Sequence, residues 1–147
     1  MTSPDRISLP ARVESLKDIR KFLKDACSLH PRLTGAVLYD IQLAVDEACT
    51  NIITHGYAGL VPGSILLDVE PSEDRVVVRI TDFGRAFEPS QAKAPAVNVP
   101  LQERKPGGFG IYFIYQSMDE VRYDVVHDRN VMTLTKYLPV TPVPGRP

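Results

Sequence analysis

The sequence has little of what marks secreted, metal-stabilised or nucleic-acid-binding proteins. Two cysteines are too few for a disulfide framework, and with only three histidines beside them a structural zinc site is not expected. The net charge is −1 with acids and bases interleaved, so the excess of Lys and Arg that favours nucleic acid is missing. No stretch approaches the roughly 18 apolar residues that span a membrane, and the N-terminus lacks the apolar segment of a signal peptide. We therefore expect a cytoplasmic protein that binds neither nucleic acid nor membrane.

The composition is that of one globular domain. The chain has 147 residues, of which 44% are hydrophobic and 24% charged. We expect a single domain over residues 1–147, with its core at about residues 6–138 and a proline-rich tail over residues 139–147. Cys27 and Cys49 fall within apolar helical patterns, so they are predicted to be reduced thiols in the core.

Hydrophobic periodicity predicts five strands and three helices. Strands are expected at residues 6–9, 64–70, 75–82, 120–126 and 131–138. Helices are expected at residues 13–29, from Thr34 as N-cap to residue 55, and at residues 111–118, where Ile114, Tyr115 and Met118 share a stripe. Residues 84–108 are rich in proline and show no period, which predicts a long loop or lid. This order favours an α+β fold, with helices on one face of a mostly antiparallel sheet.

The second predicted helix carries polar residues beside its apolar stripe. On a helical wheel of about 100° per residue, Asp40, Glu47 and Asn51 lie within about 40° of one another, at the border of the stripe. A carboxylate half-shielded from water can act as a base, and the amide oxygen of Asn51 suits a hard cation such as Mg²⁺. The helix alone is explained as well by solvated residues that flank the stripe, and the signal becomes specific only alongside the two other segments.

Asp82 and Gly84 stand where a strand ends and the long loop begins. A carboxylate there can accept a hydrogen bond from an exocyclic amine such as that of adenine, while a glycine lets a planar base approach the backbone. An ordinary Asp-x-Gly turn explains the same residues.

The stretch of residues 106–110, PGGFG, precedes the last predicted helix. Glycines at a helix start expose backbone N–H groups at the positive end of the dipole, which suits phosphate. The stretch is not a Walker motif, because no Gly-Lys-Ser/Thr follows, and it does not follow a strand as a dinucleotide fingerprint would.

Taken together, the three segments resemble those of the GHKL ATPase superfamily, as written in anti-sigma factor serine/threonine kinases of the RsbW and SpoIIAB type. Residues 46–57, DEACTNIITHGY, resemble the N-box, and residues 82–87, DFGRAF, look like the adenine-contacting box. Residues 107–114, GGFGIYFI, continued by MDEV at 118–121, resemble the second glycine box and the strand after it. The likeness covers about residues 6–138 and implies the Bergerat fold, a two-layer α/β sandwich with a mixed, mostly antiparallel sheet.

The resemblance also implies roles for single residues. Glu47 would be the catalytic base or polarise the acceptor hydroxyl, Asn51 would bind Mg²⁺, Asp82 would meet the adenine amine, and Gly84 would pass close to the base. ATP and Mg²⁺ are therefore the expected cofactors.

The glycine box would hold the phosphates of ATP. Gly108 and Gly110 would frame them, within a pocket that includes Gly107 and Phe109. Arg104 and Lys105 are the candidates in the lid for the γ-phosphate. Two departures from the family are visible: Gly56 stands where Ala is frequent, which looks harmless, and Ala86 replaces a frequent Gly or Pro.

These roles predict a protein serine/threonine kinase that phosphorylates a serine of a small anti-anti-sigma antagonist of the STAS type, with a sigma factor as a second partner. The alternative is a non-catalytic, ATP-gated binding module. The retained Glu47 favours catalysis, because a pure binder has no need of it. Dimers are frequent in the family, and no patch in the sequence decides between a monomer and a homodimer.

Overall fold

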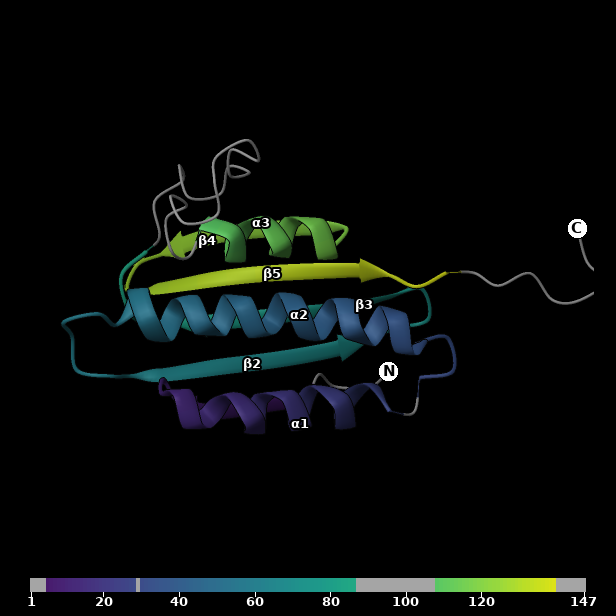
Figure 1. Cartoon of the computed structure of the whole chain (residues 1–147), viewed down its shortest axis with the longest axis horizontal. Helices are drawn as coiled ribbons and strands as arrows, with labels where there is room; N and C mark the ends of the chain where they lie inside the picture. The colour runs from purple at the N-terminus through teal and green to yellow at the C-terminus, as the bar shows by residue number, and fades with distance from the viewer. Residues whose placement is uncertain (1–4, 29, 87–107, 140–147) are drawn as a thin grey trace, which may run out of the picture.

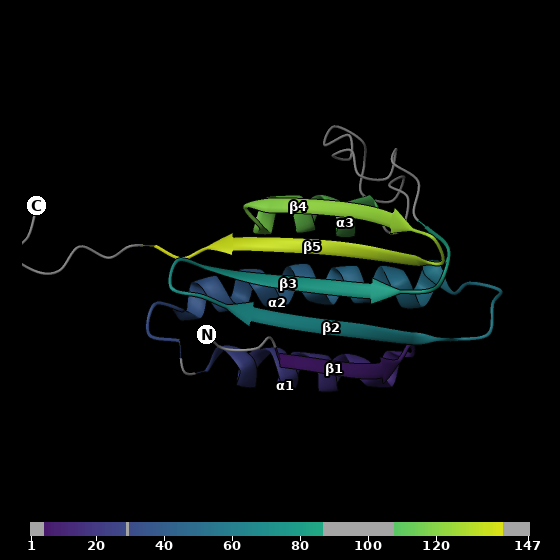
Figure 2. The ribbon, with the colours of Figure 1, turned by 180° about the vertical axis from the view of Figure 1, so that it is seen from behind.

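The computed structural model describes residues 5–28, 30–86 and 108–139. Five strands form one sheet in the order β1-β2-β3-β5-β4, and all four pairings between them are antiparallel (Figure 2). The strands are β1 (Asp5–Pro10), β2 (Ser64–Pro71), β3 (Arg75–Asp82), β4 (Glu120–Val126) and β5 (Arg129–Tyr137). The mostly antiparallel sheet is confirmed, and the described pairings contain no parallel component that would make it mixed.

The described helices cover one face of this sheet (Figure 1). They are the short η1 (Val13–Ser15), α1 (Leu16–Cys27), α2 (Gly35–Asn51), its continuation η2 (Ile52–Gly56) and α3 (Gly108–Ser117). Helix α2 lies between α1 and α3 and packs against both. The predicted layering, helices on one face of the sheet, is therefore confirmed.

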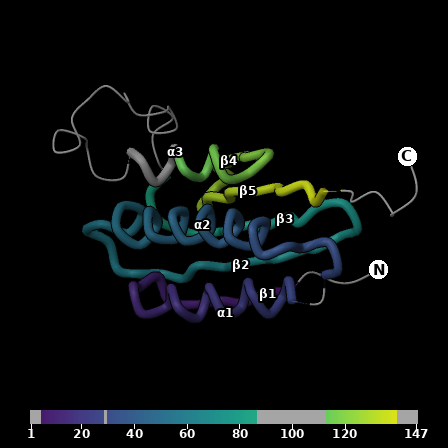
Figure 3. The backbone as a smooth tube through the Cα atoms, turned by 45° about the vertical axis from the view of Figure 1, so that its right-hand side comes forward, coloured from purple at the N-terminus to yellow at the C-terminus, as the bar shows by residue number. Residues whose placement is uncertain are grey.

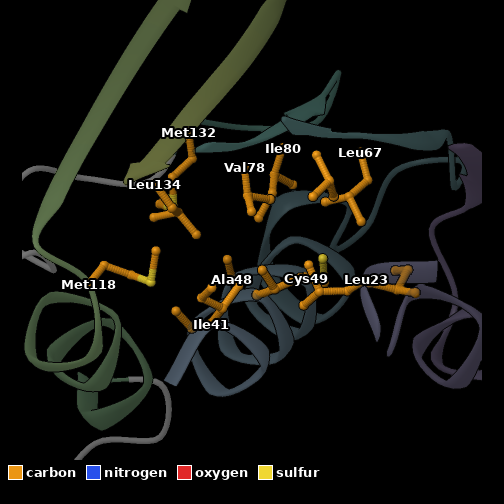
Figure 4. Close-up of a cluster of buried hydrophobic side chains, with 14 of the residues drawn as sticks. Leu23, Ile41, Ala48, Cys49, Leu67, Val78, Ile80, Met118, Met132 and Leu134 are labelled. Carbon is orange, nitrogen blue, oxygen red and sulfur yellow. The ribbon is translucent and has the colours of Figure 1, made fainter. Parts of the chain in front are cut away.

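The core fills the space between these two layers (Figure 4). Alternate residues of β2 and β3 point toward the helices and are fully buried, as the period of two in a half-covered sheet requires. Helix α2 contributes the facing stripe, including Ile41 and Val45, both at most 1% exposed. Burial of one face of the sheet fixes the strand register, because a slip of one residue would turn the apolar side chains of a strand away from the helices.

Both cysteines lie in this core, as predicted. Cys27 and Cys49 are free and buried. Burial raises the pKa of the Cys49 thiol to about 12 and that of Cys27 to about 11, so both stay protonated at neutral pH.

The boundaries of α2 follow local chemistry. The side-chain oxygen of Thr34 accepts a hydrogen bond from the backbone N–H of Val37 at 3.3 Å, so Thr34 is the N-cap that the sequence predicts. At the other end the helix does not simply stop. It continues as the wider, π-helical turn η2, a geometry that is often found at functional sites.

Helix α3 differs from its predicted form in two respects. It begins at Gly108, three residues earlier than expected, so Gly108 and Gly110 belong to its first turn rather than to a preceding loop. Ile114 and Met118 are buried, but Tyr115 is 43% exposed and does not belong to the buried stripe. The strongly apolar sequence of α3 explains the second error, because its apolar side chains do not mark one face.

Four of these elements begin or end at the same end of the molecule, the gathered end. The C-terminal ends of α2 and β3 lie there with the N-terminal ends of β5 and α3, on the left in Figure 1 and in Figure 3. The three motifs singled out in the sequence are thereby gathered, although they are far apart along the chain.

Candidate functional site

The carboxyl group of Asp82, the last residue of β3, belongs to the gathered end. Asp82 is 4% exposed and lies opposite Asn130 in the register of β3 and β5. Its Oδ1 accepts two hydrogen bonds, from the backbone N–H of Gly84 at 2.9 Å and from Nδ2 of Asn130 at 3.0 Å. Burial raises the pKa of Asp82, and these two donors oppose that rise. Both hydrogen bonds that the described residues donate to this buried carboxyl group thus go to Oδ1.

Gly84 packs directly against the end of η2. A Cβ at position 84 would lie 2.4 Å from the carbonyl oxygen of Gly56, and the next residue, Arg85, donates its backbone N–H to that same oxygen at 2.7 Å. Only glycine allows this approach. The absence of a side chain at Gly84 thus serves a contact within the protein; its predicted approach to a base stays a prediction.

Tyr57 joins the same region from the loop after η2. Its hydroxyl donates to the carbonyl oxygen of Ser64 at 2.9 Å and accepts the backbone N–H of Phe83 at 2.9 Å. The ring is 6% exposed, and burial is the main cause of the raised pKa of its phenol. Tyr57 therefore fixes the backbone beside Asp82 to the start of β2.

Glu47 and Asn51 lie one helical turn apart at the C-terminal end of α2, and both are half-buried. Burial first, and then the neighbouring Asp46, raise the pKa of Glu47, which suits a group that must accept a proton. Asp46 itself points toward α1, where it pairs with Arg20 at 2.8 Å. The charges of Asp46 and Asp82 both raise the pKa of the buried Cys49 thiol, so the end of α2 and the end of β3 are electrostatic neighbours.

Asp40 does not share the position of Glu47 and Asn51. Its carboxylate pairs with Nζ of Lys136 at 3.2 Å, and the same Nζ donates to the carbonyl oxygen of Ser117 at 2.7 Å. This link ties α2, β5 and the C-terminal end of α3 together. Asp40 thus has a structural role in an ion pair and is not a candidate for the catalytic group.

The glycine box is placed only in part. Gly108, Phe109 and Gly110 form the first turn of α3, at the gathered end of the molecule. Arg104, Lys105 and Gly107 lie outside the described residues.

Comparison with known proteins decides the family. Residues 9–136 match the family described as histidine kinase-like ATPase domain. The chain belongs to this family. Because it is a family of ATPases, ATP is the nucleotide that the domain uses.

Curated relatives of this histidine kinase-like ATPase agree with the expected type. The chain is 34% identical over 139 residues to the serine-protein kinase RsbW of Bacillus mycoides, covering 90% of this chain and 83% of that protein. It is 29% identical over 110 residues to the serine/threonine-protein kinase BtrW of Bordetella bronchiseptica, covering 75% and 78%. The predicted resemblance to the RsbW type is confirmed, and the enzyme class of the chain is that of the protein serine/threonine kinases.

A solved structure supports the fold. The crystal structure of the RsbU and RsbW domains of Rv1364c from Mycobacterium tuberculosis superposes on 93% of this chain with a TM-score of 0.67 at 20% identity. The chain spans 33% of that longer chain.

Among the residues that the structure describes, the helices are all too short or too polar to cross a membrane.

Sequence reasoning missed two polar residues at the site of this ATPase domain. Tyr57 lies within the predicted N-box without a predicted role, and Asn130 lies between two predicted strands. A signal for Asn130 exists only in the pairing of β3 with β5, which sets it opposite Asp82 across 48 positions of sequence. No local pattern reports such a contact.

Proposed function

We propose that this domain transfers the γ-phosphoryl group of ATP to a serine of a small anti-anti-sigma antagonist protein of the STAS type, and that it also sequesters a sigma factor. The observation that carries the proposal is the Asp82 carboxyl group. It is buried, it accepts both of its hydrogen bonds from described residues through Oδ1, and it is the last residue of β3, which ends on the side of the molecule where α2 ends and α3 begins.

The adenine of ATP fits Oδ2 of Asp82, to which none of the described residues donates a hydrogen bond. A buried carboxylate needs a partner, and the exocyclic amine of adenine donates the hydrogen bond that Oδ2 can accept. The buried Ile65, which pairs with Asp82 from β2, supports an apolar environment for the base. In this proposal Asp82 reads the base and Gly84 holds the backbone beside it.

The phosphates fit the start of α3. The first turn contains Gly108 and Gly110, so at these two positions no side chain would stand between the backbone and a phosphate. Gly107 would extend this cradle and Phe109 would border it. Arg104 and Lys105, in the predicted lid, would neutralise charge on the γ-phosphate.

Asn51 is the proposed protein ligand for Mg²⁺. The residue offers a neutral amide oxygen from a half-buried position on α2, and Mg²⁺ binds few protein groups when phosphate oxygens and water complete its shell. When bound, the ion would neutralise charge on the transferring phosphate. Glu47, one turn earlier, would orient the acceptor hydroxyl and take its proton.

Calorimetric titration with ATP, with and without Mg²⁺, tests the pocket in the wild type and in Asn51→Ala. We expect binding that depends on Mg²⁺ and loses this dependence in Asn51→Ala. The control is Lys21→Ala on the exposed face of α1, where the side chain is 78% exposed. A folded wild type that binds no ATP would refute the proposal.

Transfer is tested by incubating the protein with labelled ATP and an anti-anti-sigma protein. We expect the wild type to label a serine of this protein, and we expect no such label with Glu47→Gln. Exchange of partners without any phosphoprotein would instead identify a non-catalytic, ATP-gated binding module.

A further inference from the structure

Asn130 is the partner of Asp82 on the neighbouring strand, and the proposed function leaves it without a role. It is the second residue of β5 and is 3% exposed. Its Nδ2 donates to Oδ1 of Asp82 at 3.0 Å and to the carbonyl oxygen of Gly84 at 3.0 Å. Both N–H groups of this buried amide thus donate to residues of the predicted adenine-contacting box, Asp82 and Gly84.

The orientation of this amide is fixed by chemistry. A carboxylate and a carbonyl oxygen are both acceptors, so the nitrogen and not the oxygen of the amide must face them. Together with the N–H of Gly84, two donors then converge on Oδ1 of Asp82. Rotation of the carboxyl group would break both bonds, so Oδ2 is held in one direction.

We propose that Asn130 is a positioning residue that keeps Asp82 an acceptor, and that it thereby sets the preference of the site for 6-amino over 6-oxo purine nucleotides. The inference rests on the proposed binding of ATP. An ionised Asp82 can only accept a hydrogen bond, which suits the amine of adenine. A protonated Asp82 would be able to donate to the 6-oxo group of hypoxanthine or guanine, and discrimination would fall.

The balance of forces on Asp82 supports this role. Burial raises its pKa, and the hydrogen bonds from Asn130 and Gly84 lower it, that of Asn130 being the larger of the two. Without Asn130 the burial effect would meet less opposition. Asp82 would then take up its proton at a higher pH.

Other titrating groups near Asp82 can be separated from it. The pKa values of Cys49 and Tyr57, which lie in its field, are both raised, so neither group ionises in the acid range. The basic side chains beside it in the sequence and on the neighbouring strand are Arg85 and Arg129. Glu47 on α2, whose pKa is also raised by burial, and the exposed His55 on η2 are replaced in the test.

The experiment measures the dissociation constants of ATP and of ITP, its 6-oxo counterpart, by calorimetry between pH 5 and pH 8. Wild type, Asn130→Leu and Asn130→Ser are compared, each alone and with Glu47→Gln and His55→Gln added. Leu removes the donor at similar size, and Ser is too short to make both bonds while staying polar. Thr135→Ser, at a buried polar position farther along β5, is the matched control for lost packing.

The expected result has two parts. Removing a hydrogen bond to a charged group should weaken ATP binding at pH 7 by about 10-fold or more, with a smaller change for ITP. The pH below which ATP binding is lost should also move upward in both Asn130 variants and stay unchanged in Thr135→Ser. A purely structural role would weaken both nucleotides equally and leave that pH in place.

Two outcomes overturn the inference and are distinct. If the wild type binds ATP with its Mg²⁺ dependence, but the folded Asn130 variants keep the wild-type ratio of ATP to ITP affinity and the wild-type pH profile, the role of Asn130 alone is wrong. If the folded wild type binds neither nucleotide, the proposed function fails and the inference fails with it.

Discussion

The carbonyl oxygen of Gly56 occupies the place that a side chain on Gly84 would need: a Cβ built there lies 2.4 Å from it. The contact joins the end of η2 to the residues that follow β3, and it is sealed by the hydrogen bond from Arg85 to the same oxygen. The reverse contact is loose. A Cβ at Gly56 would meet its nearest neighbours at 3.7 and 3.8 Å, an ordinary van der Waals distance.

This asymmetry predicts opposite outcomes for two alanine substitutions. Gly84→Ala should lower the free energy of unfolding by about 1–3 kcal/mol, because the new methyl group meets backbone that cannot rotate away. Gly56→Ala should change it by no more than about 1 kcal/mol, since the methyl group fits and the unfolded chain loses freedom. Urea denaturation of the two variants measures both values. Equal destabilisation would show that the contact is not as close as described.

The buried carboxyl group of Asp82 should lower the stability of the folded protein at high pH while it strengthens ATP binding. Because burial raises its pKa in the folded state, the carboxyl group favours folding below its unfolded pKa, and this contribution is lost as the pH rises through the folded pKa. Asp82→Asn removes the buried charge, so its melting temperature should exceed that of the wild type at pH 8, by a margin that shrinks toward pH 4. ATP affinity should fall by about 10- to 100-fold, since the oxygen that accepts the amine is gone. Thermal unfolding and calorimetry over this pH range check both parts; a less stable variant at pH 8 would contradict the first.

Glu47 predicts a loss confined to the chemical step. If it takes the proton of the acceptor hydroxyl, Glu47→Gln should slow phosphoryl transfer by about 10²- to 10⁴-fold and leave the dissociation constant of ATP unchanged. The neighbouring Asp46→Asn is the matched control, because Asp46 pairs with Arg20 of α1. Single-turnover transfer and calorimetry separate the two quantities. A parallel loss of ATP binding would remove Glu47 from the role of base.

The sequence predicted those parts of the fold that leave a periodic trace. The alternation in residues 64–70 and 75–82 and the N-cap at Thr34 are local signals, and the structure places β2, β3 and α2 within a few residues of the expected bounds. The start of α3 was misplaced, because glycine weakens helix propensity and packing against α2 decides instead.

The site was predictable as a set of motifs but not as a geometry. Asp82 and Gly84 stood out as a pair at a strand end. That Gly84 packs on Gly56, and that Asn130 holds the Asp82 carboxyl group, depends on how α2, β3 and β5 come together. Such contacts join residues 28 or more positions apart, and no single segment of sequence encodes them. The roles of Arg104, Lys105 and Gly107 stay predictions, because these residues lie outside the described part of the chain.

The link from Lys136 to α3 predicts that an ion pair away from the pocket matters more than one on the surface. The side chain of Lys136 is 15% exposed, and its Nζ lies 2.7 Å from the Ser117 carbonyl oxygen and 3.2 Å from the Asp40 carboxylate. Lys136→Met keeps the length of the side chain but leaves the carbonyl oxygen of the buried Ser117 without this donor, which should cost about 1–3 kcal/mol of unfolding free energy. Lys21→Met breaks an i,i+4 pair with Asp25 whose side chains are 78% and 65% exposed, and should cost no more than about 0.5 kcal/mol. Urea denaturation measures both variants, and Lys136→Arg should recover part of the loss because it restores a donor. If Lys136→Met proves as mild as Lys21→Met, the C-terminal end of α3 is held by its apolar packing alone.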